Sequence, residues 1–124
     1  MGWRWIILPC LAFVLLLAAS GIASADRAEA HIDAPDTVRP GESVPIVLNL
    51  HHEDSALGHY VNSVKLYDGD RLLKEWTYDR SNFKKAEEWS VTYTGSFDKN
   101  TNLRAMANCN LHGGDGSSKS IVVR

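Results

Sequence analysis

The stretch that decides the fold reads Tyr60-Val61-Asn62-Ser63-Val64-Lys65-Leu66-Tyr67-Asp68-Gly69-Asp70. Residues 60–67 are rich in β-branched and aromatic side chains, which favour extended strands. An Asp-Gly pair between two extended runs is among the strongest short signals for a β-hairpin. Residues 71–78 then supply the second strand of the hairpin.

Short strands separated by turns also account for the chain on either side of this hairpin. In residues 88–94, Trp89, Val91 and Tyr93 alternate with small polar side chains, which is the pattern of a half-buried strand. No segment of useful length shows a helical period. Six or seven short strands in about 100 residues predict an all-β fold, an immunoglobulin-like antiparallel β-sandwich of about seven strands. The other strands are expected near Val38 and at residues 44–50, 103–108 and 120–124.

The N-terminal segment has the features of a secretory signal peptide. Arg4 supplies a positive charge, and the apolar run from Ile6 to Ala19 is short for a membrane span. Ala23-Ser24-Ala25 matches the small-residue cleavage pattern, so residues 1–25 are predicted to be removed and the product exported to the periplasm. An uncleaved N-terminal anchor is the alternative.

A second cleavage pattern, Ala28-Glu29-Ala30, would make His31 the first residue of the mature chain. With cleavage after Ala25, residues 26–124 form one domain and are too few for two. Without Arg4 the chain has 12 basic and 15 acidic residues, so its formal net charge is −3. This balance, and the lack of a basic stripe, argue against nucleic acid as a partner. We also expect no membrane contact for the mature domain.

The clearest chemical signal is the pair Cys109-x-x-His112, directly after a predicted strand. The only other cysteine, Cys10, lies in the predicted signal peptide, so Cys109 has no disulfide partner in the same mature chain. A thiolate and an imidazole together suit a transition metal such as iron, zinc or copper. The alternative is a thiol that is buried as a small apolar side chain.

A second group of possible ligands lies between two predicted strands, where residues 51–59 contain His51, His52 and His59. Taken alone, this could be an exposed polar loop. Two such loops on one small domain favour a single mononuclear metal site held by a rigid scaffold. No nucleophile-elbow motif supports a hydrolase. Structural zinc usually uses more cysteines. Copper ranks below iron because Met106 precedes Cys109, whereas blue-copper sites often add an axial methionine.

The chain resembles the iron-binding domain of superoxide reductase, also called neelaredoxin or the desulfoferrodoxin C-terminal domain. The most specific match is Cys109-Asn110-Leu111-His112-Gly113, and weaker matches cover much of the rest. The weaker matches are Ile32–Asp36, Val38, Gly41-Glu42, His59-Tyr60-Val61, Val64–Tyr67 and Ser117-Ser118-Lys119. The resemblance implies an immunoglobulin-like fold with one non-haem iron, held by four equatorial histidines and one axial cysteine.

By motif match, Cys109 would be the axial ligand, and His112 and His59 would be two equatorial ligands. His52, or the adjacent His51, would be the third. The family's fourth histidine corresponds in position to Ala28, so the nearby His31 is the remaining candidate. The lysine that precedes this histidine in the family, and attracts superoxide, is also missing.

The resemblance implies that superoxide is the substrate and that the iron reduces it to hydrogen peroxide. A separate redox protein would donate the electron. Arg27 or Lys65 would be the candidates to replace the missing lysine. The oligomeric state is left open, with a homo-oligomer among the possibilities.

Two alternative functions follow from the same residues. The displaced histidine and missing lysine are compatible with a family member that binds metal without turning over superoxide. Residues 58–61, 64–67 and Gly69 also resemble the small immunoglobulin-like carrier subunit of the periplasmic thiosulfate-oxidising system. That relative is a binding scaffold rather than a metalloenzyme.

Overall fold

The computed structural model describes residues 27–124, so the predicted signal peptide, residues 1–25, lies outside the described residues. The described chain folds into eight strands. They are β1 (Glu29–Asp33), β2 (Thr37–Val38), β3 (Val44–His51), β4 (Val61–Asp68), β5 (Arg71–Thr77), β6 (Glu88–Gly95), β7 (Thr101–Cys109) and β8 (Gly116–Val123). Within residues 27–124, no helix is long and apolar enough to cross a membrane.

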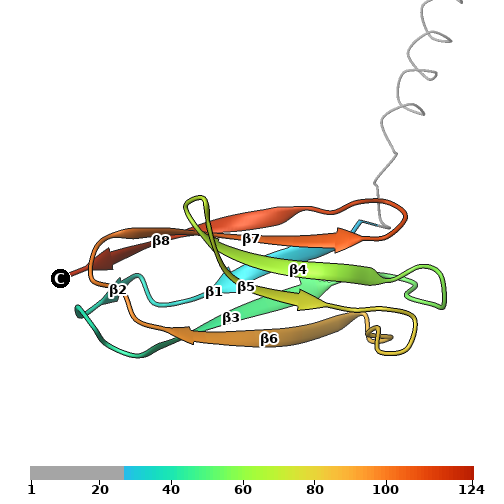
Figure 1. Cartoon of the computed structure of the whole chain (residues 1–124), viewed down its shortest axis with the longest axis horizontal. Coiled ribbons are helices and arrows are strands. Elements are labelled where there is room, and N and C mark those ends of the chain that lie inside the picture. Colours follow the sequence, from blue (N-terminus) through green and yellow to red (C-terminus); the bar gives the residue numbers. More distant parts are fainter. Residues whose placement is uncertain (1–26) are drawn as a thin grey trace, which may run out of the picture.

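The strands form two sheets that lie face to face (Figure 1). One sheet has three strands in the order β1-β3-β6, and the other has five in the order β2-β8-β7-β4-β5. The predicted immunoglobulin-like sandwich is therefore confirmed, with eight strands rather than about seven. One pairing departs from the antiparallel pattern, because the two-residue strand β2 runs parallel to β8.

Strand β1 was not among the predicted strands. It pairs with β3 over its whole length, from Glu29 opposite His51 to Asp33 opposite Val47. Its inward side chains include Ala30 and Ile32, which are buried, while the residues between them are exposed. Two small inward alanines, Ala28 and Ala30, give a weak hydrophobic pattern, which is why the segment was interpreted as a cleavage signal instead.

The hydrophobic core lies between the two sheets and is supplied by alternate residues of the facing strands. In β3 the inward residues are Val44, Ile46, Leu48 and Leu50, all of which are buried. Across the core they face the second sheet, whose buried residues include Val64, Leu66, Leu103, Ala105, Ala107 and Cys109. Because side chains alternate along a strand, neighbouring residues at the end of β3 face opposite sides of the sheet.

The hairpin predicted at Asp68-Gly69 is present as β4 and β5. Asp68 pairs with Arg71, and Gly69 has a φ of 58°, the left-handed conformation that glycine adopts without strain. The register shifts between Leu66 and Tyr67, which marks an irregularity of the β-bulge type. The predicted ends match within one residue for β3, β4, β5 and β6, whereas β7 begins two residues and β8 four residues earlier than expected.

Replacing Leu48 by alanine tests the placement of the core. Leu48 is fully buried in β3, so its truncation should lower the free energy of unfolding by about 2–5 kcal/mol. Val122, which is 40% exposed in β8, is the control, and Val122→Ala should cost about 0.5 kcal/mol or less. Urea unfolding of both variants measures the difference. Equal losses would contradict this assignment of the core.

Candidate metal centre

Four possible metal ligands converge at one end of the sandwich, at the end of β7 and in the loops that follow β3 and β7. Ligand atoms of His52, His59 and Cys109 lie within 4.8 Å of one another. His52 and Cys109 are 0% and 1% exposed, whereas His59 is half-buried. A buried thiol beside two imidazoles is a donor set that suits a transition metal.

His112 completes the group on its exposed side. Its ring centroid lies 5.1 Å from that of His59, and the two planes are at 89°. The rings of His59 and His52 are 4.8 Å apart at 68°. The three imidazoles therefore follow one another from the buried His52 to the exposed His112, with Cys109 beneath them in the core.

Hydrogen bonds at Nδ1 orient the rings of His59 and His52. Nδ1 of His59 lies 3.1 Å from the carbonyl oxygen of Asp54, which can only accept, so Nδ1 carries the proton. Nε2 of His59 then holds the lone pair, and it is buried without a hydrogen-bond partner. Nδ1 of His52 lies 2.6 Å from the Ser55 hydroxyl. Metal-bound histidines are usually oriented in this way by the nitrogen that does not bind the metal.

A tight turn positions His112 relative to Cys109. The amide of Cys109 donates to the carbonyl of Gly113 at 2.8 Å, and the amide of Gly113 donates back to Cys109 at 3.1 Å. Gly113 has a φ of 70°, which favours glycine over other residues. The turn brings His112 back beside the end of β7, so the Cys-x-x-His spacing yields one buried and one exposed candidate ligand.

Asn110 joins the two ligand loops. Its side-chain oxygen accepts from the amide of Tyr60 at 3.0 Å, and its side-chain nitrogen donates to the carbonyl of Gly58 at 3.1 Å. The same oxygen lies 3.9 Å from the Cys109 sulfur. Asn110 therefore fixes the loop that carries His59 against the loop that carries His112.

A third loop, residues 79–87, supports the His52 side of the centre. The amide of His52 donates to the carbonyl of Glu87 at 2.9 Å, and Phe83 stacks on Tyr60 with centroids 5.1 Å apart. The loop begins at Asp79, whose carboxylate accepts from the hydroxyl and the amide of Ser81. These hydrogen bonds hold the pKa of the Asp79 carboxyl below its ordinary value, and the bond from the Ser81 hydroxyl has the larger effect.

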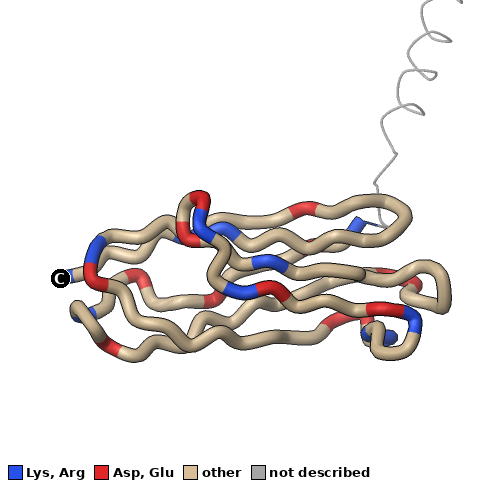
Figure 2. Tube along the Cα trace, viewed as in Figure 1, with Lys and Arg blue, Asp and Glu red and all other residues tan. Residues whose placement is uncertain are grey.

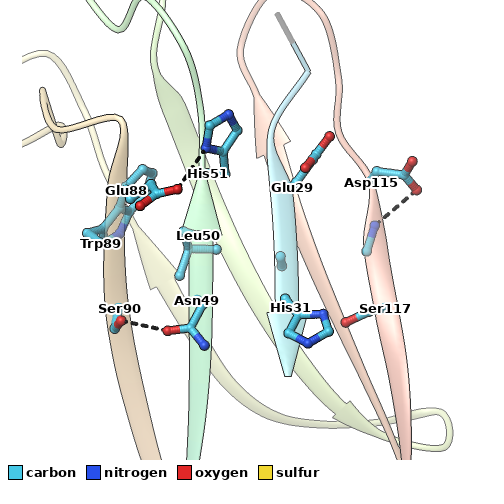
Figure 3. Close-up of a pocket in the computed structure, with 12 residues that line it drawn as sticks. Glu29, His31, Asn49, Leu50, His51, Glu88, Trp89, Ser90, Asp115 and Ser117 are labelled. Atoms are coloured by element: carbon cyan, nitrogen blue, oxygen red, sulfur yellow. Dashed lines mark hydrogen bonds and ion pairs between the residues drawn. The ribbon is translucent and has the colours of Figure 1, made fainter. Parts of the chain in front are cut away.

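The structure does not bring His31 or His51 to this group. His31 is exposed on β1, opposite Asn49, and points away from the core that contains Cys109. His51 lies on the same outer face, where Figure 3 shows it directed at Glu88. Its ring nitrogens are 3.6–3.9 Å from the carboxylates of Glu53, Glu87 and Glu88.

His31 and His51 line an open pocket of about 600 Å³ on the outer face of the three-stranded sheet (Figure 3). None of the converging ligands lines this pocket. Its lining residues are Glu29, Ala30, His31, Asn49, Leu50, His51, Glu88, Trp89, Ser90, Asp115, Gly116 and Ser117.

The two cations considered as replacements for the family lysine lie in different places. A guanidinium nitrogen of Arg27 donates to the carbonyl of Gly114 at 2.7 Å, beside the loop that carries His112. Lys65 pairs instead with Glu75, at 3.5 Å, between β4 and β5. Elsewhere in the described chain, positive and negative residues are interspersed (Figure 2).

The desulfoferrodoxin family model matches residues 23–114, which include every residue of this centre. The chain belongs to the desulfoferrodoxin family. The fold agrees, since the superoxide reductase (neelaredoxin) of Ignicoccus hospitalis aligns with a TM-score of 0.69 at 23% identity. That alignment covers 86% of this chain and 88% of the other. Family membership implies an iron-binding domain of the superoxide reductase type.

The same sandwich occurs in proteins of other kinds. The CARDB domain of PF1109 from Pyrococcus furiosus has a TM-score of 0.56 at 17% identity, covering 78% of this chain and 92% of that domain. The sulfur carrier protein SoxY from Chlorobium limicola has a TM-score of 0.51 at 16% identity, covering 92% and 98%. No curated protein sequence matches this chain. The likeness to these structures concerns the fold alone.

Two supporting residues of the centre escaped the sequence analysis. Ser55 orients the His52 ring. Ser55 lies three residues after His52 in the same loop, and this spacing is the sequence signal that could have indicated the contact. The family motif contains Asn110 without indicating its role, which is to bridge the two loops through its side-chain amide.

Replacing Asn110 by alanine should loosen the centre. Loss of its two hydrogen bonds to the His59 loop should cost about 1–2 kcal/mol and speed amide exchange at Gly58–Tyr60. Asn108, whose side chain bonds to Asn62 on the strand surface, is the matched control. Denaturant unfolding and hydrogen exchange report both effects. Equal exchange at Gly58–Tyr60 in the two variants would show that Asn110 does not join the loops.

Proposed function

We propose that this protein is an exported mononuclear non-haem iron protein that reduces superoxide to hydrogen peroxide. The observation that carries the proposal is the convergence of the Cys109 thiol with His52, His59 and His112. The buried, unpartnered Nε2 of His59 supports it, because such an atom is costly unless it binds something. The candidate ligands and the fold both suit the non-haem iron of the desulfoferrodoxin family.

When bound, iron supplies one electron to superoxide, which with two protons gives hydrogen peroxide. Cys109, as the thiolate, would hold the iron from the core side and donate electron density to it. His52, His59 and His112 would hold it from the loops. The burial of Cys109 excludes water from the sulfur, which protects the thiolate from oxidation.

The exposed side of the centre is where substrate and electrons would enter. His112 is exposed, whereas His52 and Cys109 are buried, so access is from the His112 side. Arg27 places a positive charge against the carbonyl of Gly114, two residues after His112. A cation at this position would attract the superoxide anion, a contribution that falls with ionic strength. Lys65 instead forms an ion pair with Glu75 between β4 and β5.

The electron would come from a separate redox protein. Among residues 27–124, Cys109 is the sole cysteine, so this part of the chain offers no four-cysteine iron site of its own. The signal peptide at residues 1–25 would place the reaction in the periplasm. Copper is the less favoured metal for the same ligands.

A second candidate function is metal binding without superoxide turnover. The observation that favours it is the number of imidazoles, because three histidines rather than four converge with Cys109 in the described residues. His31 lies on the outer face, and the position of the family's fourth histidine is occupied by Ala28, which has no imidazole. The rate of the superoxide reaction separates the two candidates.

Iron binding tests the centre directly. Anaerobic reconstitution with Fe²⁺ should load about one iron per chain, and oxidation should produce a visible thiolate-to-iron band. Cys109→Ser should abolish the band, and His52→Ala should weaken iron affinity at least about tenfold. His31→Ala is the matched control and should leave the band and the affinity unchanged. Absence of iron uptake by the wild type would refute the proposal and leave the carrier-like scaffold.

Superoxide reduction tests the activity. Stopped-flow mixing of superoxide with the reduced iron protein should consume about one superoxide per iron and form hydrogen peroxide. Arg27→Ala should slow the second-order rate and flatten its dependence on ionic strength, whereas Lys65→Ala should change neither. An iron-loaded protein that leaves superoxide decay at its uncatalysed rate would establish metal binding without turnover.

A further inference from the structure

We propose that Arg27 and Ala28, just before and at the entry to β1, are positioning residues that hold the metal-ligand loop, residues 109–115, in its binding conformation. The proposal rests on the metal centre described above. It assigns these residues no contact with the metal. Their effect passes through the backbone of the loop that carries His112.

Two hydrogen bonds tie the N-terminal segment to the loop. The Arg27 guanidinium donates to the carbonyl of Gly114 at 2.7 Å, and the amide of Asp115 donates to the carbonyl of Ala28 at 2.8 Å. Ala28 and Gly114 also form a parallel β-bridge. These contacts join residues 86 or 87 positions apart in the sequence.

The other hydrogen bonds of the loop run to β7 and to the His59 loop, since Ala107 donates to Asp115 and Asn110 donates to Tyr60. Asn110, Leu111 and His112 are exposed, and Leu111 is 61% exposed although it is apolar. By contrast, Ala28 is fully buried and belongs to the same core cluster as Cys109. The N-terminal segment therefore connects the exposed part of the loop to the buried part of the centre.

Gly114 shows how closely the loop is confined. A Cβ at this position would overlap with the carbonyl oxygen of Ala107 in β7. On another side Gly114 meets Arg27 and Ala28. The backbone at Gly114 thus lies between β7 and the N-terminal segment, and His112 stands two residues before this fixed point.

This arrangement makes the metal centre depend on where the exported chain is cut. Cleavage after Ala25 would retain Arg27 and Ala28, together with all of β1. Cleavage after Ala30 would remove both positioning residues and the part of β1 that pairs with Leu50 and His51. We therefore infer that the mature protein begins before Arg27, and that a chain beginning at His31 binds metal poorly.

Co²⁺ is the probe, because a thiolate-bound Co²⁺ gives a charge-transfer band that reports Cys109 directly. In the full-length chain, Arg27→Ala should weaken Co²⁺ affinity by about threefold to tenfold and speed amide exchange at Leu111–Asp115. Arg27→Lys should recover part of the affinity. Deletion of residues 26–30 should weaken binding more than about tenfold. Arg71→Ala, which removes an arginine paired with Asp68 at the β4–β5 turn, is the matched control and should bind as the wild type does.

The outcomes distinguish this inference from the proposed function. Wild-type affinity and wild-type exchange in Arg27→Ala would overturn the positioning role while leaving the metal centre intact. A wild-type protein without the Co²⁺ band would overturn the metal centre itself. If the deletion variant fails to fold, Arg27→Ala decides, because it leaves β1 complete. Mass analysis of the exported protein should place its first residue before Arg27, and a mature chain that begins at His31 would refute the cleavage inference.

Discussion

The burial of the Cys109 side chain is the constraint on which the rest of this structure depends. Cys109 is both the last residue of β7 and a member of the hydrophobic core, at 1% exposure. It pairs with Val61 of β4, so its position is set by the sheet and not by the loop. A thiolate held in this way needs a cation close by, since an unpaired buried charge is costly. The loops bring three imidazoles to that point.

The centre is buried on the side of His52 and exposed on the side of His112, because the two residues lie in different loops. His52 follows a strand whose alternate residues fill the core, and its ring is oriented by Ser55. His112 lies in an exposed turn that Asn110 and the N-terminal segment hold from two sides. The buried and the exposed candidate ligands thus lie in different loops.

Much of the fold and the convergence of the main candidate ligands could be predicted because their signals are local. The turn at Asp68-Gly69, the alternation after Trp89 and the Cys-x-x-His pair each depend on residues within a few positions. The choice between His51 and His52 could not be predicted, because it depends on which face of β3 each residue takes, and a shift of one residue reverses that. The place of His31 could not be predicted without identifying β1. The small inward residues there, Ala30 in the strand and Ala28 just before it, gave too weak a hydrophobic pattern.

X-ray absorption at the iron edge, on the reconstituted protein, tests the central claim most directly because it counts the ligands. The account predicts one sulfur at about 2.3 Å and three imidazoles at about 2.1 Å, by analogy with other metal–thiolate and metal–imidazole bonds. The sulfur shell should disappear in Cys109→Ser. A spectrum of the wild-type protein that shows only nitrogen and oxygen ligands would contradict the account.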